Sequence, residues 1–129
     1  MTLNELLKNA RDARIHSYSP YSKFQVGAAV LADDGKVYVG TNIENASYGL
    51  SICAERSAIF NAISAGNKKI VSIAVSCPQS SHTNSMMPCG ACLQVISEFS
   101  TDDTTVSVEA IGNFKITDLL RYPFRISDK

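Results

Sequence analysis

Two cysteines three residues apart could bind a metal ion together. Cys89-Gly90-Ala91-Cys92 directly follows Pro88, where the pattern predicts the start of a helix. Residues i and i+3 lie on one face of a helix, so both sulfur atoms can reach a single ion. Two cysteines supply half of a tetrahedral zinc site, but a C-x-x-C pair alone is equally compatible with a redox pair or with two unliganded thiols.

A second cysteine motif, Cys53-Ala54-Glu55, lies at the start of another predicted helix. In mid-helix, Cys53 and Glu55 would point to nearly opposite sides, and only at the first turn can both approach one ion. Cys53, Cys89 and Cys92 would supply three thiolates and leave one zinc position open for water, as in catalytic zinc sites. A carboxylate that lies beside such a site without binding the metal is suited to general acid–base catalysis.

Arg56 could act on the same centre, because it lies three residues after Cys53. Three thiolates on Zn²⁺ form a net negative cluster, which weakens the acidification of a bound water molecule. A guanidinium that donates to thiolate sulfur, and two helix N-termini that point at the metal, would offset that charge. The alternative is an ordinary surface arginine on a helix.

Composition limits the classes of protein in which this chemistry can occur. The 129 residues include 12 basic and 12 acidic side chains, and this zero net charge argues against a nucleic-acid partner. No apolar run approaches the roughly 20 residues of a membrane span, so we expect no membrane partner. The N-terminus lacks the apolar stretch of a signal peptide, which predicts a cytoplasmic protein. Its four cysteines are then thiols or metal ligands rather than disulfides.

The pattern of apolar residues predicts an α/β fold in one domain over residues 1–129. Thr2 and Glu5 fit a capping box that opens a helix to about residue 16. A β-hairpin over 24–42, a helix over 53–65 and a strand over 69–77 follow. The remaining predicted elements are a helix over 89–99, strands over 104–111 and 114–117, and a short helix near Leu119 and Leu120. This order predicts a mixed sheet covered by helices.

Three stretches carry a resemblance to a known family. PYSKFQVGAAVL (20–31), GTNIENASYGLSICAER (40–56) and PCGACLQ (88–94) resemble the small, homotetrameric zinc-dependent cytidine deaminases of the cytidine/deoxycytidylate deaminase superfamily, and the match runs essentially end to end. The resemblance implies a three-layer α-β-α sandwich around a mixed sheet of about five strands. It also implies hydrolysis of cytidine, and of 2′-deoxycytidine, to the uracil nucleoside plus ammonia in pyrimidine salvage.

The resemblance also assigns the catalytic roles. Cys53, Cys89 and Cys92 would hold one Zn²⁺ per chain, with Arg56 beside them. Glu55 would take a proton from zinc-bound water, deliver it to N3 of cytosine and later move a proton to the departing ammonia. Hydroxide would attack C4 of the base.

The family's substrate contacts map onto seven further positions. Asn42 and Glu44, on one face of an extended chain, would bind the 3′-hydroxyl end of the sugar, although a polar strand end that caps a turn is the alternative interpretation. The others are Phe24 beside the pyrimidine, the Ala54 backbone N–H on the base carbonyl, and Ala46, Tyr48 and Phe124 contributed by neighbouring subunits of a homotetramer.

The chain departs from the family pattern at several places. Leu93 stands where the family usually has arginine after the second cysteine of the C-x-x-C. The proline that usually precedes the C-terminal aromatic residue is shifted to Pro123, which affects the placement of Phe124. Cys77 matches no ligand position, and His16 and His82 receive no role.

Two other functions remain open on the sequence. A related zinc deaminase could act on an aminonucleoside antibiotic or a modified cytosine nucleoside, since only the pocket would differ. A structural zinc domain or nucleoside-binding module would have little use for Glu55 beside an open zinc position. A polynucleotide-editing deaminase is disfavoured by the zero net charge.

Overall fold

Five strands form one mixed sheet in the computed structural model, which describes residues 1–80 and 82–127. The order across the sheet is β2-β1-β3-β4-β5, and β3 and β4 are parallel while the other neighbours are antiparallel. The strands are β1 (Gly27–Ala32), β2 (Val37–Thr41), β3 (Ile70–Ser76), β4 (Ser100–Val108) and β5 (Gly112–Lys115). The predicted mixed sheet of about five strands is confirmed.

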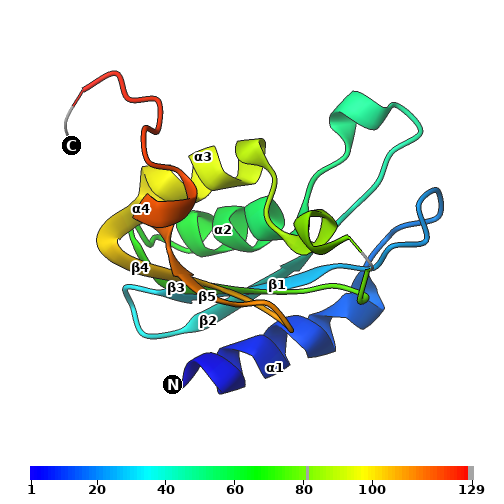
Figure 1. The fold of residues 1–129 in the computed structure, drawn as a ribbon, viewed down its shortest axis with the longest axis horizontal. Helices are drawn as coiled ribbons and strands as arrows, with labels where there is room; N and C mark the ends of the chain where they lie inside the picture. The colour runs from blue at the N-terminus through cyan, green and yellow to red at the C-terminus, as the bar shows by residue number, and fades with distance from the viewer. Residues whose placement is uncertain (81, 128–129) are drawn as a thin grey trace.

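Helices cover both faces of the sheet, which gives three layers (Figure 1). α1 (Leu3–Ala13) lies on one face, and α2 (Ala54–Ser64), α3 (Gly90–Phe99) and α4 (Ile116–Leu119) lie on the other. Alternation along β1 supplies both cores: Ala29 packs against α1, whereas Ala28 and Val30 belong to the larger core that includes α2 and α3. The predicted α-β-α arrangement is confirmed.

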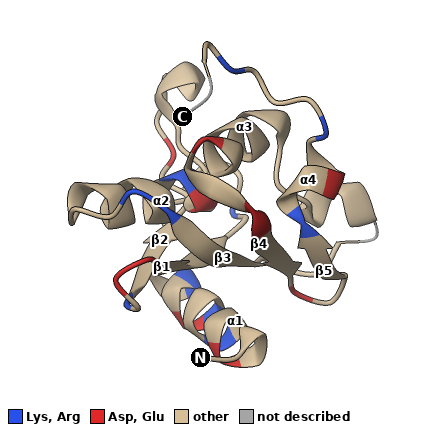
Figure 2. Cartoon of the chain, turned by 90° about the vertical axis from the view of Figure 1, so that its left-hand side faces the viewer, with Lys and Arg blue, Asp and Glu red and all other residues tan. Residues whose placement is uncertain are grey.

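α1 begins as its sequence predicts. The Thr2 side chain accepts a hydrogen bond from the Glu5 backbone, and the Glu5 carboxylate accepts one from the Thr2 backbone. Both acidic and basic residues lie along this helix (Figure 2). Three short 3₁₀ turns, η1 (Arg14–His16), η2 (Tyr48–Leu50) and η3 (Thr83–Met86), complete the described elements. No helix in residues 1–80 and 82–127 is long and apolar enough to cross a membrane.

α2 lies unusually close to β2, because Gly40 has no side chain. A Cβ atom built at Gly40 would come within 2.3 Å of the Ala58 backbone nitrogen, so no larger residue fits without displacing the helix. Residues 41–53 lead from the end of β2 into α2, so this close contact helps to place the first turn of α2 relative to the sheet.

Several strand boundaries differ from the sequence prediction. β5 covers Gly112–Lys115 instead of 114–117, because Ile116 and Thr117 begin α4, and β4 ends at Val108 instead of residue 111. The first hairpin strand begins at Gly27 instead of residue 24. β4 begins at Ser100 instead of residue 104, because the Thr104 hydroxyl accepts a hydrogen bond from the Thr101 backbone and donates one to the Ile70 carbonyl of β3. These side-chain bonds support a polar segment whose sequence has no strand-like alternation.

Candidate active site

The starts of α2 and α3 bring the two cysteine motifs together. Cys53 is the N-cap residue of α2, and Cys89 is the N-cap residue of α3. Reciprocal backbone hydrogen bonds of 2.9 and 3.0 Å between Ile43 and Ile52 close the loop that precedes Cys53. Each motif therefore lies at the N-terminus of a helix, as the sequence predicts.

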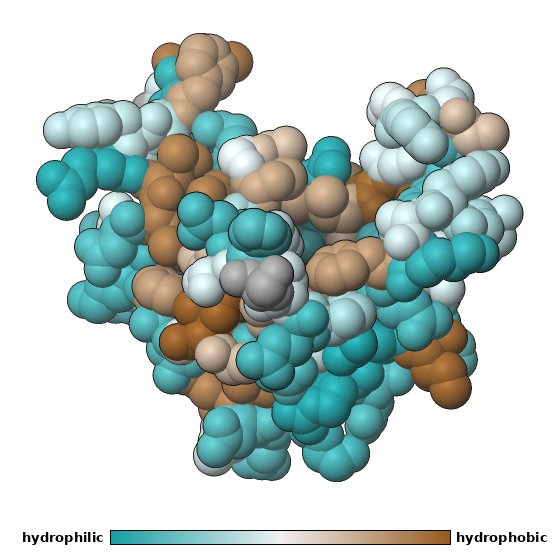
Figure 3. Space-filling model, turned by 45° about the vertical axis from the view of Figure 1, so that its right-hand side comes forward, coloured by the Kyte–Doolittle hydropathy of each residue, from teal (hydrophilic) through white to brown (hydrophobic). Residues whose placement is uncertain are grey.

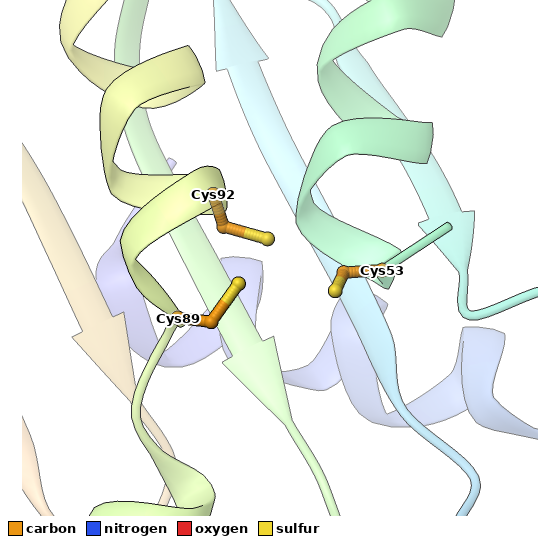
Figure 4. A group of neighbouring side chains, drawn as sticks. All are labelled: Cys53, Cys89 and Cys92. Atoms are coloured by element: carbon orange, nitrogen blue, oxygen red, sulfur yellow. The ribbon is translucent and has the colours of Figure 1, made fainter. Parts of the chain in front are cut away.

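The sulfur atoms of Cys53, Cys89 and Cys92 all lie within 4.8 Å of one another. Figure 4 shows the three side chains pointing toward one another from the two helix starts. Cys92 is buried, Cys53 is partly exposed and Cys89 is exposed. Three converging sulfur atoms could hold a metal ion, and thiolates are typical zinc ligands.

The charges around these thiols also suit a cation. Hydrogen bonds from the Cys92 thiol and the Arg56 guanidinium lower the pKa of Cys53 to about 5. The pKa of Cys92 is raised in turn, because it donates to Cys53 and because a second negative charge beside the first is unfavourable. A divalent cation would offset the repulsion between neighbouring thiolates, so that all three sulfur atoms could bind it in the deprotonated form.

Arg56 contacts the cluster directly. Its Nη2 atom donates to Cys53 Sγ over 3.3 Å, as the i, i+3 spacing predicts. The Nε atom of Arg56 is buried, and no hydrogen-bond partner for it lies among the described residues. The guanidinium is therefore held by the sulfur centre rather than by a carboxylate.

Glu55 is a buried carboxyl group beside the thiols. Only 5% of the residue is exposed, and burial raises the pKa of its carboxyl group to about 7. The positive charge of Arg56 and the neighbouring Cys92 thiol act in the opposite direction and lower the pKa of Glu55, but burial outweighs them. A carboxyl group with a pKa near 7 can both take up and release a proton, which is the property of a general acid–base catalyst.

A pocket of about 680 Å³ opens over these groups. Its volume lies in the range of small-molecule sites. Cys53, Glu55 and Cys89 reach it, and the backbone of fully buried Ala54 borders it. The other lining residues are Ser22, Phe24, Val26, Asn42, Glu44, Tyr48, Ser51, Ile52, Arg56, Val75, Cys77, Ser85, Met86 and Met87.

Asn42 lines this pocket, but much of its hydrogen-bonding capacity is used within the chain. Its Oδ1 atom accepts from the Val26 backbone at 3.0 Å and from the Ser17 hydroxyl, and its Nδ2 atom donates to the Phe24 carbonyl at 2.7 Å. The side chain therefore braces the segment that carries Phe24. One of the two Nδ2–H groups remains for a second acceptor.

Glu44 braces the same wall of the pocket. Its carboxylate accepts hydrogen bonds from the Tyr21 and Ser22 backbones, both 3.1 Å long, and from the Ser22 hydroxyl. These bonds, that from the Ser22 hydroxyl above all, lower the pKa of Glu44, so the group is a carboxylate at neutral pH. Asn42 and Glu44 thus make the turn-capping contacts that the alternative interpretation of this motif expects, and both also face the pocket.

The three residues expected from neighbouring subunits lie on the surface. Ala46 is exposed in the loop before η2, and Tyr48 is 76% exposed at the pocket rim. Phe124 is 72% exposed in the C-terminal tail and does not line the pocket of its own chain. The tail and the η2 loop lie at opposite ends of the molecule in Figure 1.

Sequence reasoning missed several residues of the pocket wall. Met86 and Met87 line it from the η3 segment, which the sequence predicts only as a polar loop. Cys77, expected as a buried thiol at a strand end, is buried there and also reaches the pocket. Apart from the C-x-x-C motif just after it, the 78–88 segment carries no pattern that would have assigned its methionines to a site.

Fold and site together define an α/β protein with a three-thiol metal centre beside a buried carboxyl group, the class of the zinc-dependent deaminases. Residues 1–108 match the family described as the cytidine and deoxycytidylate deaminase zinc-binding region, and the chain belongs to this family. The cytidine deaminase of Halalkalibacterium halodurans is 52% identical over 78% of this chain and 74% of that protein. The cytidine deaminase of Sporosarcina psychrophila is 46% identical over 92% of this chain and 96% of its own length.

Solved structures agree with this assignment. The crystal structure of cytidine deaminase from Burkholderia pseudomallei matches with a TM-score of 0.86 and 41% identity, over 96% of this chain and all of that one. Cytidine deaminase from Mycobacterium tuberculosis matches with a TM-score of 0.85 and 35% identity, over 98% of this chain and 99% of that one.

Proposed function

We propose that residues 1–129 form one catalytic domain that hydrolyses cytidine and 2′-deoxycytidine to uridine and deoxyuridine, with release of ammonia. The observation that carries this proposal is the buried Glu55 carboxyl group beside three converging cysteine sulfurs at the wall of a nucleoside-sized pocket. The similarity to cytidine deaminases over nearly the whole chain supports it. Pyrimidine salvage in the cytoplasm is the corresponding physiological role.

In this proposal, Cys53, Cys89 and Cys92 would hold one Zn²⁺, which would act as a Lewis acid and lower the pKa of a water molecule toward neutrality. Glu55 accepts a proton from the attacking water and delivers it to N3 of the base. Glu55 then takes the remaining proton from the hydroxyl group now bonded to C4 and passes it to the amino group. The C4–N bond breaks, ammonia leaves, and the C4 carbonyl of the uracil forms. The Arg56 guanidinium donates a hydrogen bond to the Cys53 sulfur, and its positive charge partly offsets the negative charge of the three thiolates.

The substrate is held by groups on the same wall of the pocket. The Ala54 N–H belongs to the first turn of α2, where backbone N–H groups have no partner within the helix, and it is assigned to the base carbonyl. Phe24 is assigned to the face of the pyrimidine. The second Nδ2–H of Asn42 and the Glu44 carboxylate are assigned to the sugar hydroxyl groups, as donor and acceptor.

The pocket is completed by neighbouring chains in this proposal, with Ala46, Tyr48 and Phe124 crossing into adjacent sites of a homotetramer. Exposed apolar side chains at both ends of the molecule support self-association. Figure 3 shows the surface hollowed between two projections, with apolar atoms on the C-terminal one. The large exposed apolar residues of the tail and the loop regions are Tyr18, Tyr21, Ile43, Tyr48, Leu50, Tyr122, Phe124 and Ile126.

One assay panel tests the proposed reaction. The purified chain is incubated with cytidine, 2′-deoxycytidine, free cytosine and an aminonucleoside antibiotic, and ultraviolet absorbance and ammonia are followed while zinc is measured per chain. We expect one zinc per chain and ammonia release from the two cytosine nucleosides. Turnover of the antibiotic alone would establish the alternative substrate class. Zinc binding without turnover of any compound would leave a zinc-binding module and would contradict the proposal.

A further inference from the structure

Gln94, on α3, forms hydrogen bonds with both backbone polar groups of Phe124. The Nε2 atom of Gln94 donates to the Phe124 carbonyl at 2.9 Å, and its Oε1 atom accepts from the Phe124 N–H at 3.0 Å. The two residues are 30 positions apart in the sequence. A primary amide that pairs with both the N–H and the C=O of one residue imitates the pairing of a neighbouring strand.

This pairing matters because the tail has no regular structure of its own. The last helix, α4, ends at Leu119, and Phe124 follows in an irregular segment. With both backbone polar groups of Phe124 engaged, the direction of its Cα–Cβ bond is set relative to α3. Phe124 is nevertheless 72% exposed, so the fold fixes the backbone of an aromatic residue that does not pack into the core of its own chain.

We propose that Gln94 is a positioning residue, which holds Phe124 so that its ring is preorganised to enter the nucleoside pocket of a neighbouring copy. This inference rests on the shared-site arrangement proposed above. An aromatic ring on an unrestrained tail would lose conformational freedom on closing a pocket, and an anchored ring loses less. Gln94 does not line the pocket of its own chain, so its effect on substrate reaches the site through Phe124.

The helix that holds Phe124 is also the helix that carries the metal centre. Gln94 lies two residues after Cys92, so α3 connects the thiol cluster of one chain to the ring offered to another. The anchor therefore ties the placement of the ring to α3, whose first turn carries Cys89 and Cys92, rather than to α4.

Kinetics of Gln94 variants test the inference. Gln94→Met keeps the length of the side chain and removes both hydrogen bonds, so KM for cytidine should rise about 3- to 10-fold, with kcat within about twofold of the parent and zinc content unchanged. Gln94→Glu keeps an acceptor for the Phe124 N–H but places a carboxylate oxygen against the Phe124 carbonyl in place of the donor, so its KM should also exceed that of the parent. Asn9→Ala is the matched control, because it removes another amide-to-backbone bond, to Glu5 in α1, far from the tail.

A double variant separates positioning from a general structural role. In the Phe124→Ala background, Gln94→Met should raise KM no further, since there is no ring left to position. An additional loss in that background, or a fall in kcat and thermal stability without a change in KM, would overturn the inference. If Phe124→Ala raises KM and neither Gln94 variant does, the Gln94 role is wrong while the shared site stands. If Phe124→Ala itself leaves KM unchanged, both fail.

Discussion

The pocket has two regions that are built in different ways. We call the three cysteines with Glu55 and Arg56 the chemical half, and the exposed rim with Tyr48, together with Phe124 of the tail, the outer half. Around the thiols, Glu55 and Cys92 are buried and held by two helix starts that pack on one sheet. Around the rim, Tyr48 is 76% exposed, and Phe124 projects from the tail without reaching its own pocket. One chain thus brings the reacting groups together by itself, and in the proposed shared-site arrangement further copies of the chain enclose the substrate.

The outer half is nevertheless ordered. Glu44 holds the backbone of the 17–24 loop, Gln94 holds the tail, and Asn45 caps the turn before η2 through its contact with the Ser47 backbone. At the rim, hydrogen bonds from polar side chains to backbone groups fix the conformation of the chain, whereas around the thiols the packing of buried residues does so. Such bonds leave the apolar rings outside and available to a partner.

Removal of a thiol should cause the largest effect, because it damages both the chemistry and the fold. Cys89→Ala should lose zinc, lose activity and melt at a lower temperature, since the ion joins the starts of α2 and α3 and its binding free energy contributes to folding. Zinc content by atomic absorption and thermal melting measure this. Cys77→Ala is the control for metal binding and should keep its zinc, because this thiol lies outside the three-sulfur cluster. Full zinc occupancy in Cys89→Ala would show that the ligand set is wrong.

Glu55→Gln should abolish turnover while it leaves the outer half intact. General acid–base catalysis contributes about 10²–10⁴-fold, and a carboxyl group that serves several proton transfers should reach or exceed the upper value. Zinc content and cytidine binding, measured by equilibrium titration, should persist. Glu5→Gln, in the capping box of α1, is the control with normal activity. An active Glu55→Gln variant would eliminate the proposed mechanism.

The same division explains how much could be predicted from the sequence. The chemical half depends on short motifs at helix starts, so the spacings of Cys89-Gly90-Ala91-Cys92 and Cys53-Ala54-Glu55 were enough to predict that the thiols meet. The capping box and the hairpin over 24–42 are equally local features, and the structure confirms the capping box and the antiparallel pairing of β1 with β2.

What the sequence did not reveal depends on pairs that are far apart in the chain. Thr104 bonds to Ile70 across 34 positions and supports a strand that begins earlier than its pattern indicates. Gln94 bonds to Phe124 across 30 positions, and no local pattern announces that contact. The brace that Asn42 forms could be anticipated only as an alternative, because an amide at a strand end suits a sugar hydroxyl as well as a turn.

Arg56→Ala should weaken the chemical half without dismantling it. The guanidinium contacts Cys53 Sγ but does not replace a ligand, so its removal should lower zinc affinity about 10- to 100-fold, as is typical of groups that support metal ligands. Competition with a chromogenic chelator measures the affinity. Arg56→Lys keeps the positive charge but loses the planar guanidinium donor, so its zinc affinity should lie between those of the parent and Arg56→Ala. Unchanged affinity in Arg56→Ala would make the contact incidental to metal binding.

Mixing two inactive variants gives the smallest signal and tests the comparison most directly. Glu55→Gln damages the chemical half of its own chain, and Phe124→Asp damages only the ring that its chain lends to a neighbour. After reversible dissociation of an equal mixture and reassembly, some sites combine an intact Glu55 from one chain with an intact Phe124 from another. Random assortment makes this about one quarter of the sites, so about one quarter of the parent activity per chain should return.

The result is interpretable only if subunits exchange. A tagged and an untagged parent chain, mixed under the same conditions, should therefore co-purify. With exchange demonstrated, an absence of recovered activity would mean that each chain closes its own pocket, and a fully active monomeric parent would mean the same. In either case the tail would have to reach the site of its own chain, across the distance that now separates it from the η2 loop in Figure 1. The reactions assigned to the thiols and Glu55 would be unaffected, because both belong to the half that one chain assembles alone.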